Sequence, residues 1–263
     1  MDLELKGKVA VVAAASQGLG RAIAEALAAE GVWVAICART ATRLHATAEE
    51  IRQQTGAEVL AVPTDVTRAE EVERFVQAVI DRWGTVHIGV ANAGGPPAKE
   101  FPAISLDDWQ NAVALNLMSA VHLARAVLPP MRAQKWGRLV FLTSASVKEP
   151  IEGLLLSNSV RSAVAGLSKT LANECGGDNV LVNTVCPGYT RTERLEELAA
   201  SLSQQRGVTR EQIARGWTAQ IPLGRIGEPR ELAALVAFLA SERASYITGT
   251  AIAVDGGRTR SLL

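Results

Sequence analysis

The chain has 263 residues, and its 27 Lys plus Arg balance its 27 Asp plus Glu, so the formal net charge is zero. Such a balance offers no basic field for nucleic acid, and neither end of the chain carries a run of like charges. The apolar fraction of 48% is typical of a globular protein. This length suffices for one large α/β domain or two small ones with a sizeable core.

Cysteines and histidines are few and scattered. The cysteines are odd in number and form no Cys-x-x-Cys pair: Cys37, Cys175 and Cys186. This usage favours a reduced, cytosolic interior over a disulfide framework. The histidines lack the spacing of metal ligands: His45, His87 and His122. We therefore expect no metal site.

The first residues, "MDLELKGKVAVV", are acidic and continue directly into a strand-like run, so they do not resemble a secretory signal. No apolar stretch approaches the roughly 20 residues that a membrane helix needs. The sequence therefore predicts a soluble, cytoplasmic protein without membrane association.

Short apolar runs alternate with helical patterns along the whole chain. The runs predict seven strands, at residues 8–14, 32–38, 58–66, 86–95 (running into a glycine-rich loop), 138–146, 180–190 and 250–257. Helical periodicity covers residues 19–31, 42–54, 69–84, 106–134, 154–174 and 228–242. Strands that are apolar throughout are covered on both faces. We predict an α/β fold of the Rossmann type, a doubly wound seven-stranded parallel sheet with helices on both faces, in a single domain spanning residues 1–263.

One connection, residues 190–227, is polar, helical and unusually long. Connections of this length often form lids over a site, and a decorative insertion is an equally good interpretation on length alone.

A glycine pair, Gly18 and Gly20, lies between the first predicted strand and the first predicted helix. Glycines at this place let the main chain approach a pyrophosphate, which then lies at the positive end of the helix dipole. A glycine pair alone is weak evidence, but its position in an α/β chain makes it a strong indication of a dinucleotide site.

The second predicted strand ends in Cys37-Ala38-Arg39-Thr40, with Arg43 one turn further on. A carboxylate there would bind the adenosine ribose and repel a 2′-phosphate, whereas an arginine suits that phosphate. We therefore predict NADP(H) over NAD(H). The competing interpretation is that these arginines are solvated residues at a helix start.

Motifs in the right order over nearly the whole chain resemble the short-chain dehydrogenase/reductase family, and most closely its β-ketoacyl-acyl-carrier-protein reductase-like group. The motifs are "ANAGG" at 91–95, Asp65-Val66, Asn116, Ser144, Pro187-Gly188 with Thr190 and Thr192, and the C-terminal "PLGRIGEPRELAALVAFLAS" and "YITGTAIAVDGG". The resemblance assigns coenzyme contacts to Ala14, Ser16, Gln17, Gly18, Leu19, Gly20, Arg39, Asp65, Val66, Asn92, Ala93, Gly94, Arg161, Pro187, Gly188, Thr190 and Thr192.

Two departures from the family pattern stand out. Ala13 and Ala14 occupy the places where the family's phosphate loop begins Thr-Gly. Counting from Ser144, the family's Tyr-x-x-x-Lys falls on Ser157 and Arg161. Gly166 keeps the family's register, so a misalignment does not explain the difference. The resemblance therefore places the catalytic positions at Asn116, Ser144, Ser157 and Arg161.

The second departure bears on the chemistry. In the family, hydride passes between nicotinamide and a carbonyl carbon while the tyrosine protonates the oxygen and the lysine holds the ribose. Serine is a much weaker acid than a phenol, and arginine keeps its charge but never gives up its proton. Losing general acid catalysis costs about 10²–10⁴ in rate, so slow turnover can survive.

Two hypotheses follow. One is an NADP(H)-dependent oxidoreductase acting on a keto or hydroxy group of a small molecule or an acyl thioester, for example a 3-oxoacyl thioester. The other is a coenzyme-binding protein without turnover, a sensor or scaffold. Tyr189 can be a replacement phenol, although packing on the lid hinge is the simpler interpretation. The resemblance also implies a homodimer or homotetramer, through the apolar stretches 117–128 and 164–171.

Overall fold

The structure is a computed structural model that describes residues 1–262. Its centre is a seven-stranded parallel sheet in the order β3-β2-β1-β4-β5-β6-β7. The strands are β1 (Val9–Val12), β2 (Trp33–Ala38), β3 (Val59–Pro63), β4 (Ile88–Ala91), β5 (Gly137–Leu142), β6 (Val180–Pro187) and β7 (Ala251–Val254). The predicted doubly wound α/β fold is confirmed, and the strand order reverses direction beside β1.

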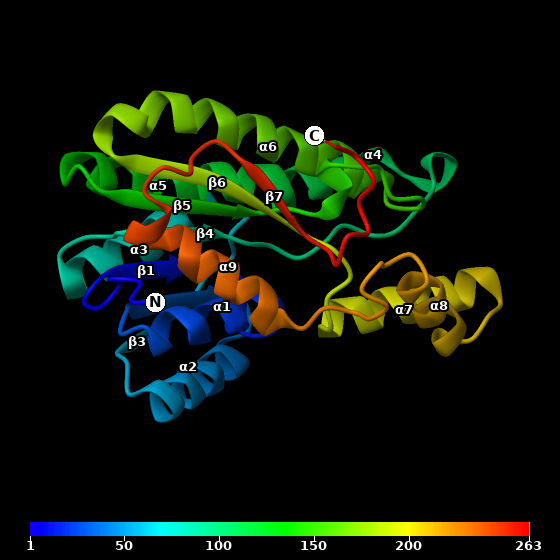
Figure 1. Cartoon of the computed structure of the whole chain (residues 1–263), viewed down its shortest axis with the longest axis horizontal. Helices are drawn as coiled ribbons and strands as arrows, with labels where there is room; N and C mark the ends of the chain where they lie inside the picture. Colours follow the sequence, from blue (N-terminus) through cyan, green and yellow to red (C-terminus); the bar gives the residue numbers. More distant parts are fainter. Residues whose placement is uncertain (263) are drawn as a thin grey trace.

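Helices cover both faces of the sheet (Figure 1). One face carries α1 (Gly18–Ala29), α2 (Ala41–Thr55) and α9 (Pro229–Ala240). The other carries α3 (Ala69–Trp83), α5 (Ser119–Ala133) and α6 (Leu155–Cys175). Each helix presents an apolar stripe to the sheet, so two hydrophobic cores form, one on either side.

The apolar runs of the strands follow from this double cover. In β1, Ala10 and Val12 pack into the core of α1 and α9, while Val9 and Val11 pack into the core of α3 and α5. Successive side chains of a strand point to opposite faces, so both sets must be apolar. This is why the strand reads as an unbroken run and not as an alternating one.

Residues 106–133 form one long helical stretch made of α4 (Leu106–Ala112), a π-helical segment (Val113–Met118) and α5. By length and composition this stretch, the one such helix in residues 1–262, could cross a membrane. The expectation that no segment reaches that threshold was therefore wrong. Side chains of α5 such as Leu123, Val127 and Met131 are buried against the sheet, so α5 is a core helix of this fold.

The long connection folds into α7 (Glu193–Arg206) and α8 (Arg210–Thr218), which project from one end of the molecule (Figure 1). Thr192 and Thr209 cap the two helices through their hydroxyl groups. A separate small core around Trp217 holds the pair together. The predicted helical character of residues 190–227 is confirmed, and we call this segment the lid below.

Short helical turns complete the chain between these elements, at Phe101–Ala103, Ala145–Val147, Gly176–Asp178 and Glu242–Ala244. The predicted strand at 86–95 runs into its glycine-rich loop after Ala91, as expected, and the predicted strand 138–146 ends early, at Leu142. The residues beyond those ends leave the sheet as loops, and these loops line the site described next.

Candidate active site

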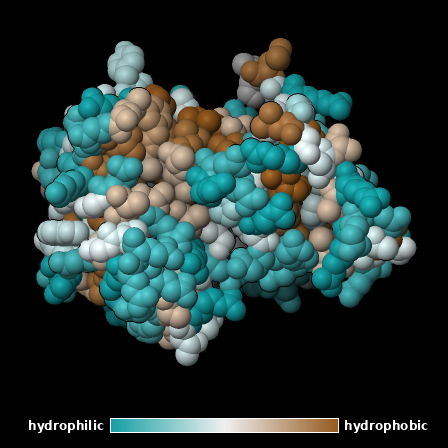
Figure 2. All heavy atoms as spheres, turned by 60° about the horizontal axis from the view of Figure 1, so that its bottom comes forward, coloured by the Kyte–Doolittle hydropathy of each residue, from teal (hydrophilic) through white to brown (hydrophobic). Residues whose placement is uncertain are grey.

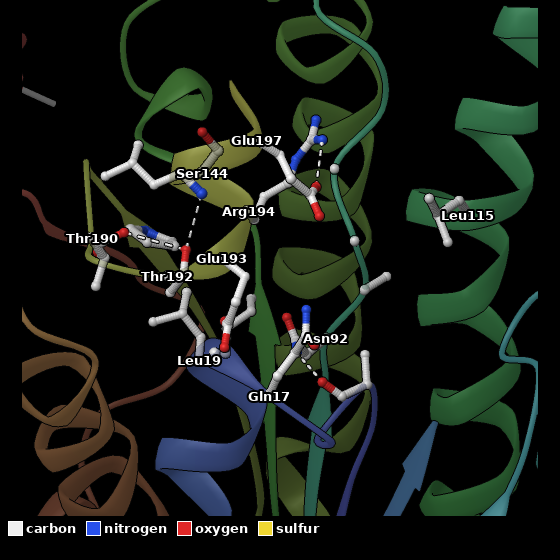
Figure 3. A pocket seen from close by; sticks show the side chains of 18 of the residues that line it. Gln17, Leu19, Asn92, Leu115, Ser144, Thr190, Thr192, Glu193, Arg194 and Glu197 are labelled. Carbon is white, nitrogen blue, oxygen red and sulfur yellow. Dashed lines mark hydrogen bonds and ion pairs between the residues drawn. The ribbon is translucent and has the colours of Figure 1, made fainter. Parts of the chain in front are cut away.

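A cavity of about 580 Å³ lies at the carboxyl ends of the central strands, between the body and the lid. Its walls come from the loops after β1, β2, β3, β4, β5 and β6 and from the first turns of α6 and α7. Figure 3 shows Gln17 and Asn92 on one side of the cavity, Thr190 and Thr192 on another, and Leu115 apart on its own helix. A cleft at the switch point of a doubly wound sheet is where this architecture binds ligands.

The N-terminus of α1 is open toward this cavity. No side chain caps it, and its first turn carries no acidic residue, so its main-chain N–H groups are free to bind an anion. A methyl group on Gly20 would lie 2.4 Å from the Ala14 carbonyl oxygen, so only glycine permits this close passage of helix and loop. The loop therefore has the form of a phosphate cradle.

Ala14 has a left-handed main chain with φ of +48°. This conformation costs a residue with a Cβ about 1–2 kcal/mol. The Asn92 amide donates to the carbonyl oxygens of Ala13 and Ala14, both at 3.2 Å, and so holds the loop in place. The turn keeps the shape that glycine would give it, at a cost in stability.

The ribose end of the cavity is basic. Arg39, Thr40 and Arg43 line it, and the Arg43 side chain donates to the amide oxygen of Gln17. The Asp65 carboxylate accepts from the main-chain N–H and the hydroxyl of Thr67, so it is turned into its own loop. The cavity at this end thus presents guanidinium groups and no carboxylate from the end of β2.

At the other end of the cavity stand the hydroxyl groups of Ser144 and Ser157. The Ser144 hydroxyl accepts from the main-chain N–H of Ser146 at 3.1 Å. The Ser146 and Ser157 hydroxyl oxygens lie 3.4 Å apart, and either can donate. Ser157 comes from the first turns of α6, and its side chain is buried.

Arg161 lies one turn after Ser157 and is 8% exposed. Its guanidinium donates to three main-chain carbonyls, those of Leu142 at 3.2 Å, Thr143 at 3.0 Å and Gly94 at 3.3 Å. Burial lowers the pKa of Arg161 to about 10, and the charge of Arg194 adds to the effect. The group therefore remains a cation at neutral pH, and carbonyl dipoles, not a carboxylate, compensate its charge.

Asn116 lies in the π-helical segment and lines a second, small cavity of about 10 Å³ together with Arg161. Its amide nitrogen donates to the Gly94 carbonyl at 2.7 Å, the same oxygen that Arg161 reaches. Its amide oxygen is buried without a partner. Asn116 thus holds the loop after β4 in place on the side away from the main cavity, and it affects that cavity only through this loop.

The segment after β6 forms the opposite wall. A methyl group on Gly188 would lie 2.5 Å from Cβ of Asp255, so glycine lets this segment pass close to the end of β7. Thr190 pairs in a parallel bridge with Gly227, which closes the base of the lid. Lid residues then cover the cavity: the Arg194 guanidinium donates to the Pro96 carbonyl at 2.7 Å, and Figure 3 shows Arg194 beside Glu197.

Tyr189 stacks on Trp217 with ring centroids 4.8 Å apart. Burial raises the pKa of its phenol above the ordinary value. A raised pKa makes a phenol a weaker acid, so this environment does not prepare Tyr189 for proton donation. The structure supports the packing interpretation of this residue.

Most of the residues singled out from the sequence meet in one cavity. The structure brings together Ala14, Ser16, Gln17, Gly18, Leu19, Arg39, Asp65, Val66, Asn92, Ala93, Gly94, Ser144, Ser157, Arg161, Pro187, Gly188, Thr190 and Thr192. Gly20 and Asn116 do not line the cavity but pack against the loops that do. Sequence reasoning missed Thr143, Ile151, Leu154 and Arg258 as lining residues, because no motif marks them and only the tertiary fold brings them there.

Comparison with known proteins gives a consistent assignment. A family model described as enoyl-(acyl carrier protein) reductase matches residues 13–259. The chain is 36% identical over 257 residues to the 3-oxoacyl-(acyl-carrier-protein) reductase FabG of Aquifex aeolicus, covering 98% of this chain and 99% of that protein. It is 34% identical to a monensin polyketide synthase putative ketoacyl reductase of Streptomyces virginiae, covering 95% and 96%.

Among solved structures, L-sorbose reductase from Gluconobacter frateurii, complexed with NADPH and L-sorbose, matches with a TM-score of 0.94 and 35% identity, covering 100% of both chains. The chain belongs to the short-chain dehydrogenase/reductase family, as its motifs indicated. The family is one of oxidoreductases, and the predicted resemblance is confirmed.

The left-handed Ala14 makes a first prediction. Ala14→Gly should raise the free energy of unfolding by about 1 kcal/mol, because glycine adopts positive φ without strain. Ala13→Gly is the matched control, since Ala13 is buried and lacks positive φ, and it should lower stability. Chemical denaturation measures both. An Ala14→Gly variant no more stable than the parent would show that the turn is not strained.

Proposed function

We propose that the chain is an NADP(H)-dependent oxidoreductase that transfers hydride to or from a keto or hydroxy group, with 3-oxoacyl thioesters among the candidate substrates. One observation carries the proposal. A single cavity joins the open N-terminus of α1 to the hydroxyl groups of Ser144 and Ser157 beside the buried Arg161. Coenzyme cradle and reaction site are therefore continuous.

The residues present fit a dinucleotide. The uncapped α1 N-terminus and the close approach at Gly20 suit a pyrophosphate. Arg39 and Arg43 suit a 2′-phosphate, and the N-terminus of α2 beside them also lacks a side-chain cap. Structures of family members with NADPH bound support the same choice.

The bound coenzyme supplies or accepts the hydride, and the chain provides the rest. Ser144 and Ser157 can each donate a hydrogen bond to the substrate oxygen, which gains negative charge as the carbonyl is reduced. The Arg161 cation lies next to Ser157 and favours that charge electrostatically. Neither a serine nor an arginine gives up a proton readily at neutral pH, so solvent water supplies the proton.

This chemistry sets the expected rate. Without a phenol the chain forgoes a general acid, which contributes about 10²–10⁴ in rate. Positioning of hydride and carbonyl is retained, and oriented hydroxyl donors still stabilise the developing charge. We infer slow turnover, with the substrate held mainly by the lid and the cavity walls.

The second candidate function is coenzyme binding without turnover, as a sensor or scaffold. The observation that favours it is the engagement of Arg161, whose two terminal nitrogens already bind three main-chain carbonyls. A residue so engaged has few donors left for a ribose, and its role would then be structural.

Turnover separates the two candidates. The wild-type chain should oxidise NADPH with at least one member of a panel of ketones and 3-oxoacyl thioesters. Ser157→Tyr with Arg161→Lys should raise that rate, by up to about 10²–10⁴, because it restores a general acid. Ser162→Ala, exposed on the same helix, is the control and should change nothing. Turnover absent in the wild type but gained by the double variant would favour the second candidate.

The choice of coenzyme has its own test. NADPH should bind the wild type more tightly than NADH in a fluorescence titration. Arg39→Ser should weaken NADPH binding about tenfold or more and leave NADH nearly unchanged, since a charge-assisted phosphate contact is lost. Arg74→Ser removes an exposed arginine of α3 and should affect neither coenzyme. Equal or tighter NADH binding by the wild type would refute NADP(H) preference.

We also propose a cytoplasmic homodimer or homotetramer, formed by one domain spanning residues 1–263. Its support is the apolar surface of the long helical stretch, where Leu106, Val113 and Met118 are exposed. The predicted contacts at 117–128 and 164–171 lie partly inside the protomer, since Leu123, Val127 and Val164 are buried.

Light scattering measures the assembly. The proposal expects a mass of two or four chains of 27.8 kDa, and Met118→Glu should lower it because a charge would enter an apolar contact. Glu73→Lys, on exposed surface of α3, is the control. A monomeric wild type would overturn the proposal.

A further inference from the structure

Arg258 has unsatisfied hydrogen-bonding capacity at the wall of the cavity. It lines the cavity, and its Nε and Nη1 atoms are buried without a partner. Its Nη2 donates to the Gln220 amide oxygen at 3.4 Å, and the Tyr189 hydroxyl also lies close enough to interact with the guanidinium. A guanidinium carries five N–H donors. Buried donors of a charged group that lack protein acceptors need an external partner, and an anion is the partner that such a group binds most strongly.

A turn after β7 presents this arginine to the cavity. Gly256 and Gly257 both have positive φ, and the Asp255 carboxylate accepts from the main-chain N–H of Gly257 at 3.0 Å and of Thr259 at 2.8 Å. Asp255 is therefore committed to shaping the turn, and it influences Arg258 only through space. The turn therefore supplies a cation whose Nε and Nη1 donors are not hydrogen-bonded to the Asp255 carboxylate.

The surroundings of Arg258 favour an anion. Its guanidinium carbon lies 5.2 Å from the centroid of the Tyr189 ring, which itself stacks on Trp217. Aromatic rings lower the local dielectric and so strengthen a charge pair. Arg206, from the end of α7, also acts on the Tyr189 hydroxyl. The neighbourhood is thus cationic as well as apolar.

Arg258 lines the same cavity as Ser144 and Ser157. Tyr189 directly follows Pro187-Gly188, the segment assigned to the coenzyme, and Gln220 belongs to the lid. Arg258 therefore lies where the lid, the body and the cavity meet.

Figure 2 shows the outer face of the molecule on which α2 lies forward; this face is largely hydrophilic, with apolar patches nearer the top of the view.

We propose that Arg258 binds an oxyanionic group of the substrate, a carboxylate or a phosphate ester, and so determines which carbonyl compounds the site accepts. This inference rests on the proposed function, since it assigns the substrate class of the same cavity. With a weak acid at Ser157, an anchored substrate compensates by holding the carbonyl in place beside the serine hydroxyls.

Binding of matched probes tests the proposal without turnover. Calorimetry with the NADP⁺-loaded protein and with the free protein compares 4-oxopentanoate with its methyl ester, and dihydroxyacetone phosphate with dihydroxyacetone. At least one charged probe should bind about tenfold or more tightly than its neutral partner. Tighter binding of 4-oxopentanoate than of its methyl ester identifies a carboxylate site. Tighter binding of dihydroxyacetone phosphate than of dihydroxyacetone identifies a phosphate-ester site.

Variants of Arg258 test whether this residue causes the preference for the charged probe. Arg258→Met should abolish it while leaving the neutral probe unchanged, and Arg258→Lys should retain part of it because the charge remains. Arg260→Met is the matched control, an exposed arginine two residues on, and should keep the full preference. Thermal unfolding of each variant confirms that it is folded, and the lysine variant still decides the matter if Arg258→Met does not fold.

The outcomes separate this proposal from the proposed function. Charged and neutral probes that bind equally, or that both fail to bind, overturn the role of Arg258, as does a preference that survives in Arg258→Met. A charged probe that binds through Arg258 but does not support NADPH oxidation supports the anion site and counts against turnover of that probe.

Discussion

The Arg161 guanidinium is the interaction on which the site depends. From α6 it reaches the carbonyls of Leu142 and Thr143 at the end of β5 and that of Gly94 after β4. Three elements that are distant in sequence are thereby joined at one buried cation. Gly94 also accepts from Asn116, so the π-helical segment is tied to the same point. A lysine has a single nitrogen, whereas the planar guanidinium can satisfy several carbonyls at once. The substitution thus changes the structural role of the position as well as its chemistry.

Ser157, one helical turn before Arg161, changes the chemistry of the cavity wall. Ser157 leaves the cavity wall with a short hydroxyl side chain, hydrogen-bonded to Ser146, where a phenol would project. Stabilisation of a developing oxyanion then relies on oriented hydroxyl groups and on the nearby fixed positive charge. Because this arrangement lacks a strong proton donor, positioning of the substrate becomes the larger contribution to rate. The lid, which reaches Pro96 through Arg194, and the cation at Arg258 serve that positioning.

The fold could be predicted from the sequence because each strand is an apolar run and each helix has an apolar stripe, so the local pattern and the double-layered core agree. The spacing of the motifs in the sequence also predicted several site residues, namely the glycine loop, Arg39, Ser144, Ser157 and Arg161. Three features of the site could not be predicted from the sequence. The positive φ of Ala14 depends on the packing of Gly20 and Asn92 against the loop. The three carbonyl partners of Arg161 come from separate elements, and Arg258 reaches the cavity only after β7 and the lid meet. The extent of the helical stretch at 106–133 was predicted correctly, but its overall hydropathy was underestimated because apolar residues continue through the π-helical segment.

The central claim is that this site transfers hydride without a titrating side-chain acid. The most direct measurement is the single-turnover rate of NADPH oxidation, followed by stopped flow from pH 6 to pH 9 with a reactive ketone. Serine and arginine do not ionise in this range, so the account predicts a rate that is nearly independent of pH. A rate that falls about tenfold per pH unit above a single pKa within the range would contradict it, since that profile requires a titrating proton donor.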